Sequence, residues 1–160
     1  MGACHFRNAE HRGRLGAMLL IIGILAADRA VKLLAAACMA PGESRPIVGE
    51  LLQFTFSKNT GAAFGLGAAH TWLVILFNGI LMAGVFYFLF FRCRSLWMML
   101  SLAAVFGGGL GNLIDRICLG YVMDMFDLRG FAIFNVADIF VCIGCVLFCL
   151  SFAFSEKNHV

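Results

Sequence analysis

Long runs of apolar residues without charge dominate the pattern of the chain. Three runs, over residues 71–91, 95–116 and 136–155, contain either no charged residue or charges only close to one end. The hydrocarbon core of a bilayer is about 30 Å thick, and about 20 helical residues are needed to cross it. Each run therefore predicts a transmembrane helix.

A fourth apolar run, over residues 15–38, is interrupted by charge. Asp28, Arg29 and Lys32 lie within it, but the residues around them are apolar over a helical length. We therefore predict an all-α integral membrane protein with four transmembrane helices. No internal repeat or change of composition divides the sequence, so residues 1–160 are expected to form a single membrane domain.

The connection expected between the first two helices, residues 39–70, is too long for a simple turn. Within it, residues 52–57 alternate apolar and polar side chains with period two, which is typical of a strand. We therefore predict a small extracytoplasmic β-structure between helices 1 and 2. The second connection on that side, residues 117–135, is shorter and is expected to form a loop.

The composition excludes several classes of protein. Hydrophobic residues make up 62% of the chain and charged residues 13%, and the mean hydropathy is +0.93. A soluble domain carries about 25% charged residues, and one of this size could not bury so much apolar surface. Disorder is excluded by the same numbers, and most cysteines lie in apolar runs rather than in the loops of a disulfide-rich secreted domain. A net charge of +3 is too small to indicate a nucleic-acid partner.

Positive charges flank the predicted helices mainly on one side. Six lie at the helix ends there: Arg7, Arg12, Arg14, Arg92, Arg94 and Lys157. The positive-inside rule makes that side cytoplasmic, so both termini are expected inside. The opposite side carries basic residues only in longer loops, and the bias is modest.

Acidic residues gather on the opposite, outer side. Seven of the nine lie in the outer half of the predicted helices or in the outer loops: Asp28, Glu43, Glu50, Asp115, Asp124, Asp127 and Asp138. Ionisable groups at membrane depth are costly, and they usually face the interior of a bundle and serve a function. Several acids from different helices at one depth therefore predict a functional site on this side.

These acids also have structural interpretations. Asp28 and Lys32 are spaced i, i+4 and can pair on one helix. Asp115 is next to Arg116 and can form an interfacial ion pair, and Asp138 can be an acid favoured by the dipole at a helix N-terminus.

A small proton- or ion-translocating protein is the alternative function. It would use Asp28, Asp115 and Asp138 as relay sites, and it predicts acids on both sides of the midplane. The cytoplasmic halves of the predicted helices carry none.

The sequence lacks the motifs of several other protease classes. The four histidines form no H-E-x-x-H zinc motif, and neither G-x-S-x-G nor S-x-x-K is present. Cys142 and Cys145 form a C-x-x-C inside an apolar run, where cysteine acts as a small packing residue. The glycine-rich stretch 107–111 predicts close helix packing. We expect no metal and no other cofactor.

Four motifs, in order along the chain, resemble those of one family. They are D-R-A-V-K at 28–32, N-T-G-A-A-F at 59–64, N-L-I-D-R at 112–116 with G-Y-V-M-D at 120–124, and F-N-V-A-D at 134–138. Together they resemble the motifs of the lipoprotein signal peptidases (signal peptidase II). Arg29 stands where this family usually has glutamine, but the spacing of Asp28 and Lys32 is intact.

The resemblance implies an aspartyl endopeptidase. Its catalytic pair would be Asp124 and Asp138. Five further residues match family positions that support the pair or contact substrate: Asn59, Asn112, Asp115, Arg116 and Asn135. Asp28 and Lys32 match a structural pair. Two carboxyl groups held close together tend to share one proton, so that one activates water while the other protonates or hydrogen-bonds the substrate.

The resemblance also implies a location and partners. It indicates a multi-pass protein of the bacterial inner membrane with its active site at the outer, periplasmic face. The substrates would be diacylglyceryl-modified prolipoproteins, cleaved just before the lipidated cysteine. Membrane lipids are the other expected partners, and a monomer is expected.

Overall fold

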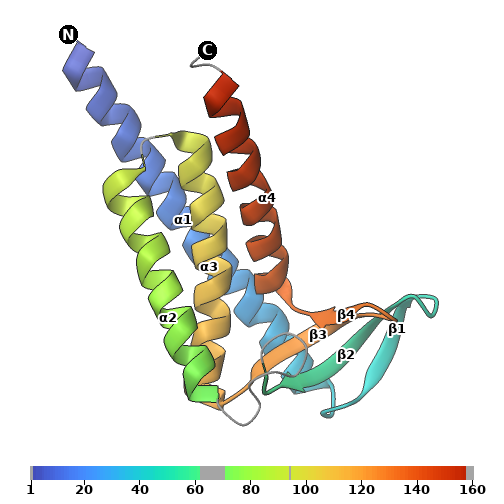
Figure 1. Ribbon diagram of the computed structural model, residues 1–160. Coiled ribbons are helices and arrows are strands. Elements are labelled where there is room, and N and C mark those ends of the chain that lie inside the picture. The colour runs from blue at the N-terminus through green and yellow to red at the C-terminus, as the bar shows by residue number, and fades with distance from the viewer. Residues whose placement is uncertain (1, 62–70, 94, 158–160) are drawn as a thin grey trace.

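Four long helices form the body of the protein (Figure 1). The computed structural model describes residues 2–61, 71–93 and 95–157. The helices are α1 (Gly2–Cys38), α2 (Thr71–Tyr87) with the π-helix η2 (Phe88–Arg92) that continues it, α3 (Leu96–Leu119) and α4 (Val136–Lys157). The described chain is mostly helical, as the apolar pattern predicts.

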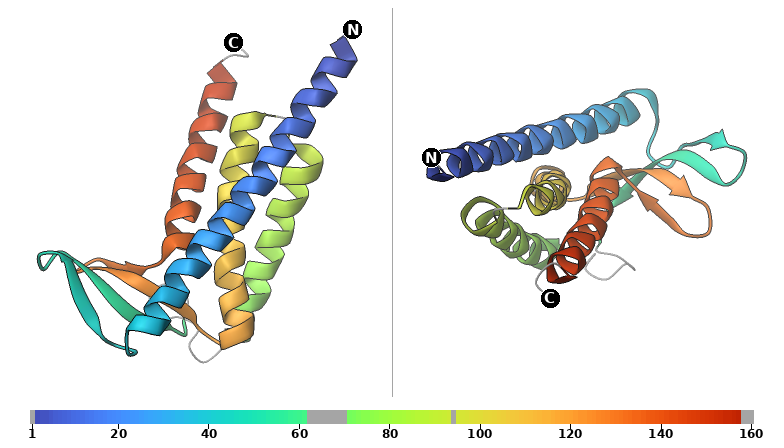
Figure 2. Two further views of the ribbon diagram at one scale, coloured as in Figure 1. Left: turned by 180° about the vertical axis from the view of Figure 1, so that it is seen from behind. Right: turned by 90° about the horizontal axis from the view of Figure 1, so that it is seen from above.

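Helix α3 lies at the centre of the bundle and contacts each of the other three helices (Figure 2). In its apolar span 56% of the residues are buried, against 11% in the spans of α2 and α4. Gly108 allows α4 to approach, because a Cβ there would overlap the carbonyl oxygen of Ala137. A Cβ on Gly107 would lie 3.3 Å from Ile21 Cα of α1. The glycine-rich stretch is thus confirmed as a helix-packing surface.

Three helices in the described part of the chain are long and apolar enough to cross a membrane: Thr71–Arg92, Leu96–Leu119 and Val136–Phe154. They correspond to the three uncharged runs of the sequence. Helix α1 is not among them, because Asp28, Arg29 and Lys32 interrupt its apolar run.

Helices α1, α3 and α4 extend beyond their predicted bounds, α4 by two residues to Lys157. Helix α1 begins at Gly2 rather than at residue 15, and no proline in the preceding segment ends it. Helix α3 continues past residue 116 to Leu119. It ends at Gly120, whose φ of 79° is left-handed and whose N–H donates to the carbonyl oxygen of Arg116 at 3.1 Å. Hydropathy does not locate such ends, because they depend on backbone conformation.

The sheet is larger than predicted. Its strands pair in the antiparallel order β1 (Ser44–Val48), β2 (Leu52–Asn59), β3 (Val122–Leu128) and β4 (Ala132–Phe134). Only β1 and β2 lie between α1 and α2; β3 and β4 form within residues 117–135, where the prediction of a loop is wrong. Residues 122–125 are all buried, so both faces of β3 are covered there. A strand buried on both faces lacks the period-two pattern.

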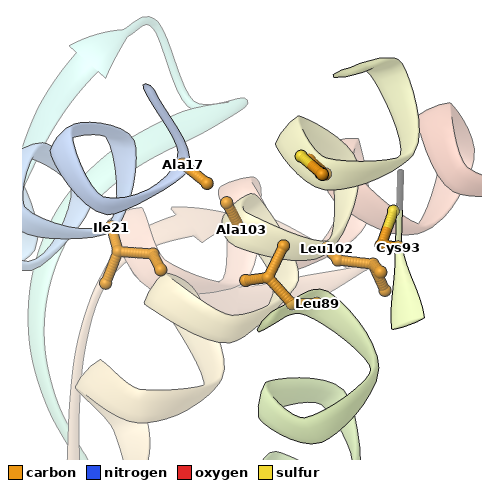
Figure 3. Close-up of a cluster of buried hydrophobic side chains, with 7 residues drawn as sticks. Ala17, Ile21, Leu89, Cys93, Leu102 and Ala103 are labelled. Carbon is orange, nitrogen blue, oxygen red and sulfur yellow. The ribbon is translucent and has the colours of Figure 1, made fainter. Parts of the chain in front are cut away.

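Two apolar clusters join the helices to one another and to the sheet. One joins α1, η2 and α3 and is drawn in Figure 3: Ala17, Ile21, Leu89, Cys93, Met99, Leu102 and Ala103. In the other, Ala35 and Met39 at the end of α1 pack against Phe56 of β2 and Met123 and Met125 of β3. This second cluster fixes the sheet to the end of α1 and places the adjoining ends of β2 and β3 beside the bundle.

Candidate active site

The two aspartates singled out by the sequence lie at the end of the bundle that bears the sheet. Asp124 is on β3 and Asp138 is in the first turn of α4. The side chain of Asp124 is buried, and Asp138 is half-buried. We refer to these two residues as the aspartate pair.

Asn135 connects the two carboxyl groups. Its Nδ2 donates to Asp124 Oδ1 at 2.7 Å, and its backbone N–H donates to Asp138 Oδ2 at 3.1 Å. In return, the backbone N–H of Asp138 donates to Asn135 Oδ1 at 2.9 Å. This reciprocal arrangement is a capping box at the N-terminus of α4. The residues that begin the helix therefore also orient both members of the aspartate pair.

Two more asparagines complete the set of donors. Asn112 of α3 donates from Nδ2 to Asp138 Oδ1 at 2.7 Å, and its Oδ1 accepts from Asn135 Nδ2 at 2.9 Å. Asn59, the last residue of β2, donates from Nδ2 to Asp124 Oδ2 at 3.0 Å. Each of the four carboxyl oxygens thus accepts a hydrogen bond from a neutral amide.

Burial is the main influence on the titration of Asp124. It raises the pKa of this carboxyl group from 3.8 to about 6. The hydrogen bond from Asn59 lowers the pKa because it favours the charged form, whereas the negative charge of Asp138 raises it. The result is a carboxyl group that exchanges its proton close to neutral pH.

Asp28 and Lys32 belong to a larger buried ion network. Lys32 Nζ lies 2.7 Å from Asp28 Oδ2 and 2.7 Å from Asp115 Oδ2. All three residues are almost completely buried, where a charge is costly unless it is paired. The pair indicated by the i, i+4 spacing is formed, and it extends to α3 through Asp115.

The ion network also contacts the backbone beside the aspartate pair. Asp28 Oδ1 accepts from the N–H of Ala137, the residue before Asp138, at 3.0 Å. Asp115 Oδ2 accepts from the N–H of Met123, the residue before Asp124, at 3.4 Å. The network therefore holds α1, α3, β3 and α4 in register at the site.

Arg29 is a member of this network that sequence reasoning missed. Its Nη2 lies 2.8 Å from Asp115 Oδ1, and its side chain is 38% exposed. The departure from glutamine in the family motif marked the position as unusual. Its partner is 86 residues further along the chain, so no local spacing could identify the contact.

Arg116 contacts the segment that follows β2. Its Nη2 donates to the carbonyl oxygen of Gly61 at 3.5 Å, and its Nη1 donates to the carbonyl oxygen of Asn112 at 3.4 Å. The N–H of Gly61 in turn donates to Asn59 Oδ1 at 3.1 Å. Arg116 and Asn59 therefore fix the same residue at the edge of the site.

All the site residues predicted from the sequence lie in or beside this cluster of contacts. Residues 62–64 of the N-x-G-A-A-F motif fall outside the described residues. Within the described ranges, no three His, Cys, Asp or Glu side chains are grouped so that they could hold a metal ion. The expected independence from metals and cofactors stays a prediction.

Comparison with known proteins identifies relatives over nearly the whole chain. The family model for signal peptidase (SPase) II matches residues 20–154. The lipoprotein signal peptidase of Halothermothrix orenii is 35% identical over 139 residues, which cover 87% of this chain and 96% of that protein. The lipoprotein signal peptidase of Moorella thermoacetica is 38% identical over 135 residues, covering 82% of this chain and 89% of the relative.

The fold also has counterparts among solved structures. A bacterial membrane enzyme determined at 2.3 Å resolution superposes with a TM-score of 0.82 at 28% identity, covering 89% of this chain and 90% of that one. A second structure, also of a bacterial membrane enzyme, gives a TM-score of 0.79, again at 28% identity, over 86% and 92% of the two chains.

Proposed function

Because the chain belongs to the signal peptidase II family, an aspartic endopeptidase family, it removes signal peptides from prolipoproteins, and we propose that Asp124 and Asp138 perform the hydrolysis. The observation that carries this assignment is the hydrogen bonding of both carboxyl groups to Asn135. Translocation of protons or ions, the alternative raised by the buried acids, finds no support among these relatives.

The two carboxyl groups have different environments, which suggests different roles. Asp124 is the more buried and has a pKa of about 6, so we assign the shared proton of the resting pair to it. Asp138 is half-buried and lies in the first turn of α4, where the helix dipole favours a negative charge. In this assignment Asp138 is the base and Asp124 is the acid.

Hydrolysis then follows general acid–base chemistry. Asp138 takes a proton from a water molecule, whose oxygen attacks the carbonyl carbon of the scissile peptide bond. Asp124 gives its proton to the carbonyl oxygen, and a tetrahedral intermediate forms. When the C–N bond breaks, the proton held by Asp138 passes to the leaving amine, and the proton on the intermediate's hydroxyl returns to Asp124.

The other predicted site residues support this chemistry through position. Asn59, Asn112 and Asn135 direct the carboxyl groups without adding charge. Four residues further from the carboxyl groups fix the backbone on which the aspartate pair and Asn59 lie: Asp28, Lys32, Asp115 and Arg116.

We further propose that α1 also crosses the membrane, which makes four spans. The three charged residues within its apolar run, Asp28, Arg29 and Lys32, are paired inside the bundle, so they do not contact lipid except at the exposed part of Arg29. The aspartate pair lies at the opposite end of the bundle from the two termini (Figure 1). With the termini in the cytoplasm, the site is at the outer face of the inner membrane, where a lipid-anchored substrate presents its scissile bond.

A cleavage assay tests the assignment of the aspartate pair. Purified diacylglyceryl-prolipoprotein is incubated with wild type, Asp124→Asn or Asp138→Asn, and the loss of the signal peptide is followed on a gel. We expect each variant to lose at least about a hundredfold in rate, the usual contribution of a general acid or base.

Asp127→Asn is the matched control. Asp127 is on the same strand as Asp124, but its carboxylate accepts only from Thr55 Oγ1 at 3.4 Å among the contacts of the described chain. This variant should keep near wild-type activity. Substantial activity in either Asn variant of the aspartate pair would remove that residue from the proposed mechanism, while the family assignment would stand.

A further inference from the structure

The free end of the sheet exposes large apolar side chains on both of its hairpins. They are Ile47 (50% exposed), Val48 (57%) and Leu51 (63%) near the β1–β2 turn, and Phe131 (83%) and Ile133 (38%) near the β3–β4 turn. The turns lie side by side, because the N–H of Arg129 donates to the carbonyl oxygen of Leu51 at 3.0 Å. We call these five apolar residues the apolar tip.

No other part of the described protein covers the apolar tip. The opposite end of the same sheet buries Phe56, Met123 and Met125 against α1. Among the described strands, the end far from the bundle is the one that leaves its apolar side chains open. An apolar patch formed by several neighbouring side chains usually marks a surface that contacts another molecule or a membrane.

The position of the sheet indicates what covers this surface. In the view from above in Figure 2, the sheet extends sideways beyond the outline of the helices. In Figure 1 and in the rear view of Figure 2, its free end stands at about the level at which α4 begins. Because the apolar surfaces of α2, α3 and α4 lie in the bilayer, the region beside the bundle at this level is the edge of the lipid.

We propose that the apolar tip inserts into the outer leaflet and forms a second lipid contact, separate from the helices. The proposal rests on the membrane orientation given above. Lipid acyl chains fit this surface, because it is apolar and lies at the level at which the helices face lipid. Phe131 is the principal anchor, since it is the most exposed of the five side chains.

The charges around the apolar tip predict which lipids matter. Arg129 and Glu50 are both exposed in the adjacent turns, and they carry opposite charges. Insertion is therefore expected to depend on apolar burial rather than on attraction to anionic headgroups. It should be the same in vesicles of phosphatidylcholine alone and in vesicles that also contain phosphatidylglycerol.

Insertion would position the active site. Strand β2 runs from the apolar tip to Asn59, and β3 carries Asp124 and ends at the tip. Contact of one end of these strands with lipid would set the height of the other end relative to the membrane surface. That height decides whether a bond next to a lipid anchor can reach the aspartate pair.

Fluorescence quenching by brominated lipids tests the proposal. Phe131→Trp is reconstituted into phosphatidylcholine vesicles, and the signal of the wild-type protein, which contains Trp72 and Trp97, is subtracted. We expect lipids brominated near the headgroup to quench most of the added fluorescence, and aqueous iodide to quench little. Leu51→Trp, on the other hairpin, should behave in the same way and provides the result if Phe131→Trp does not fold.

Pro41→Trp is the control for these two variants. Pro41 is exposed in the turn between α1 and β1, away from the apolar tip. Its added fluorescence should be quenched by iodide and not by brominated lipid. If iodide quenches the added fluorescence of both tip variants as strongly as that of this control, the proposal is overturned.

Two further outcomes of the quenching experiment distinguish lipid from other molecules that could cover the apolar tip. If iodide quenches both tip variants and adding the prolipoprotein removes that quenching, the tip binds substrate and the proposal is wrong. If the protein is shown to cleave prolipoprotein in detergent while both tip variants stay accessible to iodide in vesicles, the lipid contact fails but the proposed function stands.

Discussion

At the scale of single residues, the main feature of the site is that, among the described residues, neutral amides and not cations contact the aspartate pair. Asn59, Asn112 and Asn135 supply its side-chain hydrogen bonds, whereas the Lys32 ammonium group is held by Asp28 and Asp115. A cation in direct contact would lower the pKa of a carboxyl group and release its proton. Amide donors orient the carboxyl oxygens without adding positive charge. Burial can therefore keep one proton on the aspartate pair.

The raised pKa of Asp124 predicts a pH dependence. Asp124 must be protonated to act as the acid, so kcat/KM should fall as the pH rises through about 6. Asn59→Ala removes a hydrogen bond that lowers this pKa, and the alkaline limb should then move to higher pH. The profile of kcat/KM against pH, measured with both proteins, checks the direction; a limb that moves to lower pH would contradict it.

The same pKa predicts the sign of a stability effect. Between pH 3.8, the ordinary pKa, and about 6, the folded protein binds this proton more tightly than the unfolded chain does. The contribution of Asp124 to the free energy of unfolding therefore decreases as pH rises through that window. Asp127→Asn should leave this pH dependence unchanged.

The buried ion network predicts unequal costs for its two cations. Lys32→Met leaves two buried carboxylates without their shared cation and should lower the free energy of unfolding by about 3–5 kcal/mol. Arg29→Gln removes a cation that is partly exposed and should cost about 1 kcal/mol, because solvent already screens it. Thermal unfolding in detergent compares the two variants. Equal losses of stability would show that Lys32 is not the centre of the network.

At the scale of secondary-structure elements, the site depends on how closely α3 and α4 pack. Asn112 is on α3, while Asn135 and Asp138 are at the start of α4. The hydrogen bonds between them require the contact that Gly108 makes with Ala137. A separation of these helices by about an ångström would lengthen the bonds of 2.7 and 2.9 Å beyond hydrogen-bonding distance.

Substitution of Gly108 tests this dependence. Gly108→Ala places a methyl group against the Ala137 carbonyl, and overpacking of this kind costs about 1–3 kcal/mol. We expect cleavage to fall together with stability. Gly84→Ala is the control, because nothing lies within 4 Å of a Cβ there, and Ala should stabilise helix α2 by up to about 1 kcal/mol. Equal activity of the two variants would contradict the predicted role of Gly108.

The elements differ in how far the sequence predicts them. The uncharged runs predict α2, α3 and α4, because lipid-facing helices are apolar on nearly every side. The alternation at residues 52–57 predicts β2, which has a more and a less buried face. Strand β3 gives no such signal, since residues 122–125 are buried whichever face they lie on.

The site is predictable in its residues but not in its contacts. The motifs point to Asp124 and Asp138, and the i, i+4 spacing predicts the contact of Lys32 with Asp28. The contact of Arg29 with Asp115, and that of Asp28 with the backbone of Ala137, join segments that are far apart in the sequence. Such contacts depend on how the helices cross, which a single sequence does not encode in any local pattern.

At the scale of the whole molecule, the two ends of the bundle differ in chemistry. One end carries both termini, with Arg12, Arg14 and Arg92 nearby, and the other carries the sheet and the aspartate pair (Figure 1). The positive-inside rule predicts that the end with these basic residues lies in the cytoplasm. In the proposed orientation, the carboxyl groups of the aspartate pair face the exported substrate.

Reporter fusions test this orientation. A fluorescent protein that folds only in the cytoplasm should fluoresce when fused to the C-terminus, and alkaline phosphatase at the same position should be inactive. Alkaline phosphatase fused after Arg129, in the β3–β4 turn, should be active because that turn is predicted to be outside. If the phosphatase is active at the C-terminus and inactive after Arg129, the predicted topology is wrong.

The capping box at the start of α4 also has a consequence for biosynthesis. Asp138 and Asn135 belong to the last helix and its cap, and their hydrogen bonds to Asp124 and Asn112 can form only after that helix has left the ribosome and entered the membrane. A nascent chain that ends before residue 135 already contains Asp124, the residues of the ion network and all four strands of the sheet, but it has no second carboxyl group beside Asp124. If the aspartate pair performs the hydrolysis as proposed, proteolytic activity is absent until synthesis of the polypeptide is nearly complete.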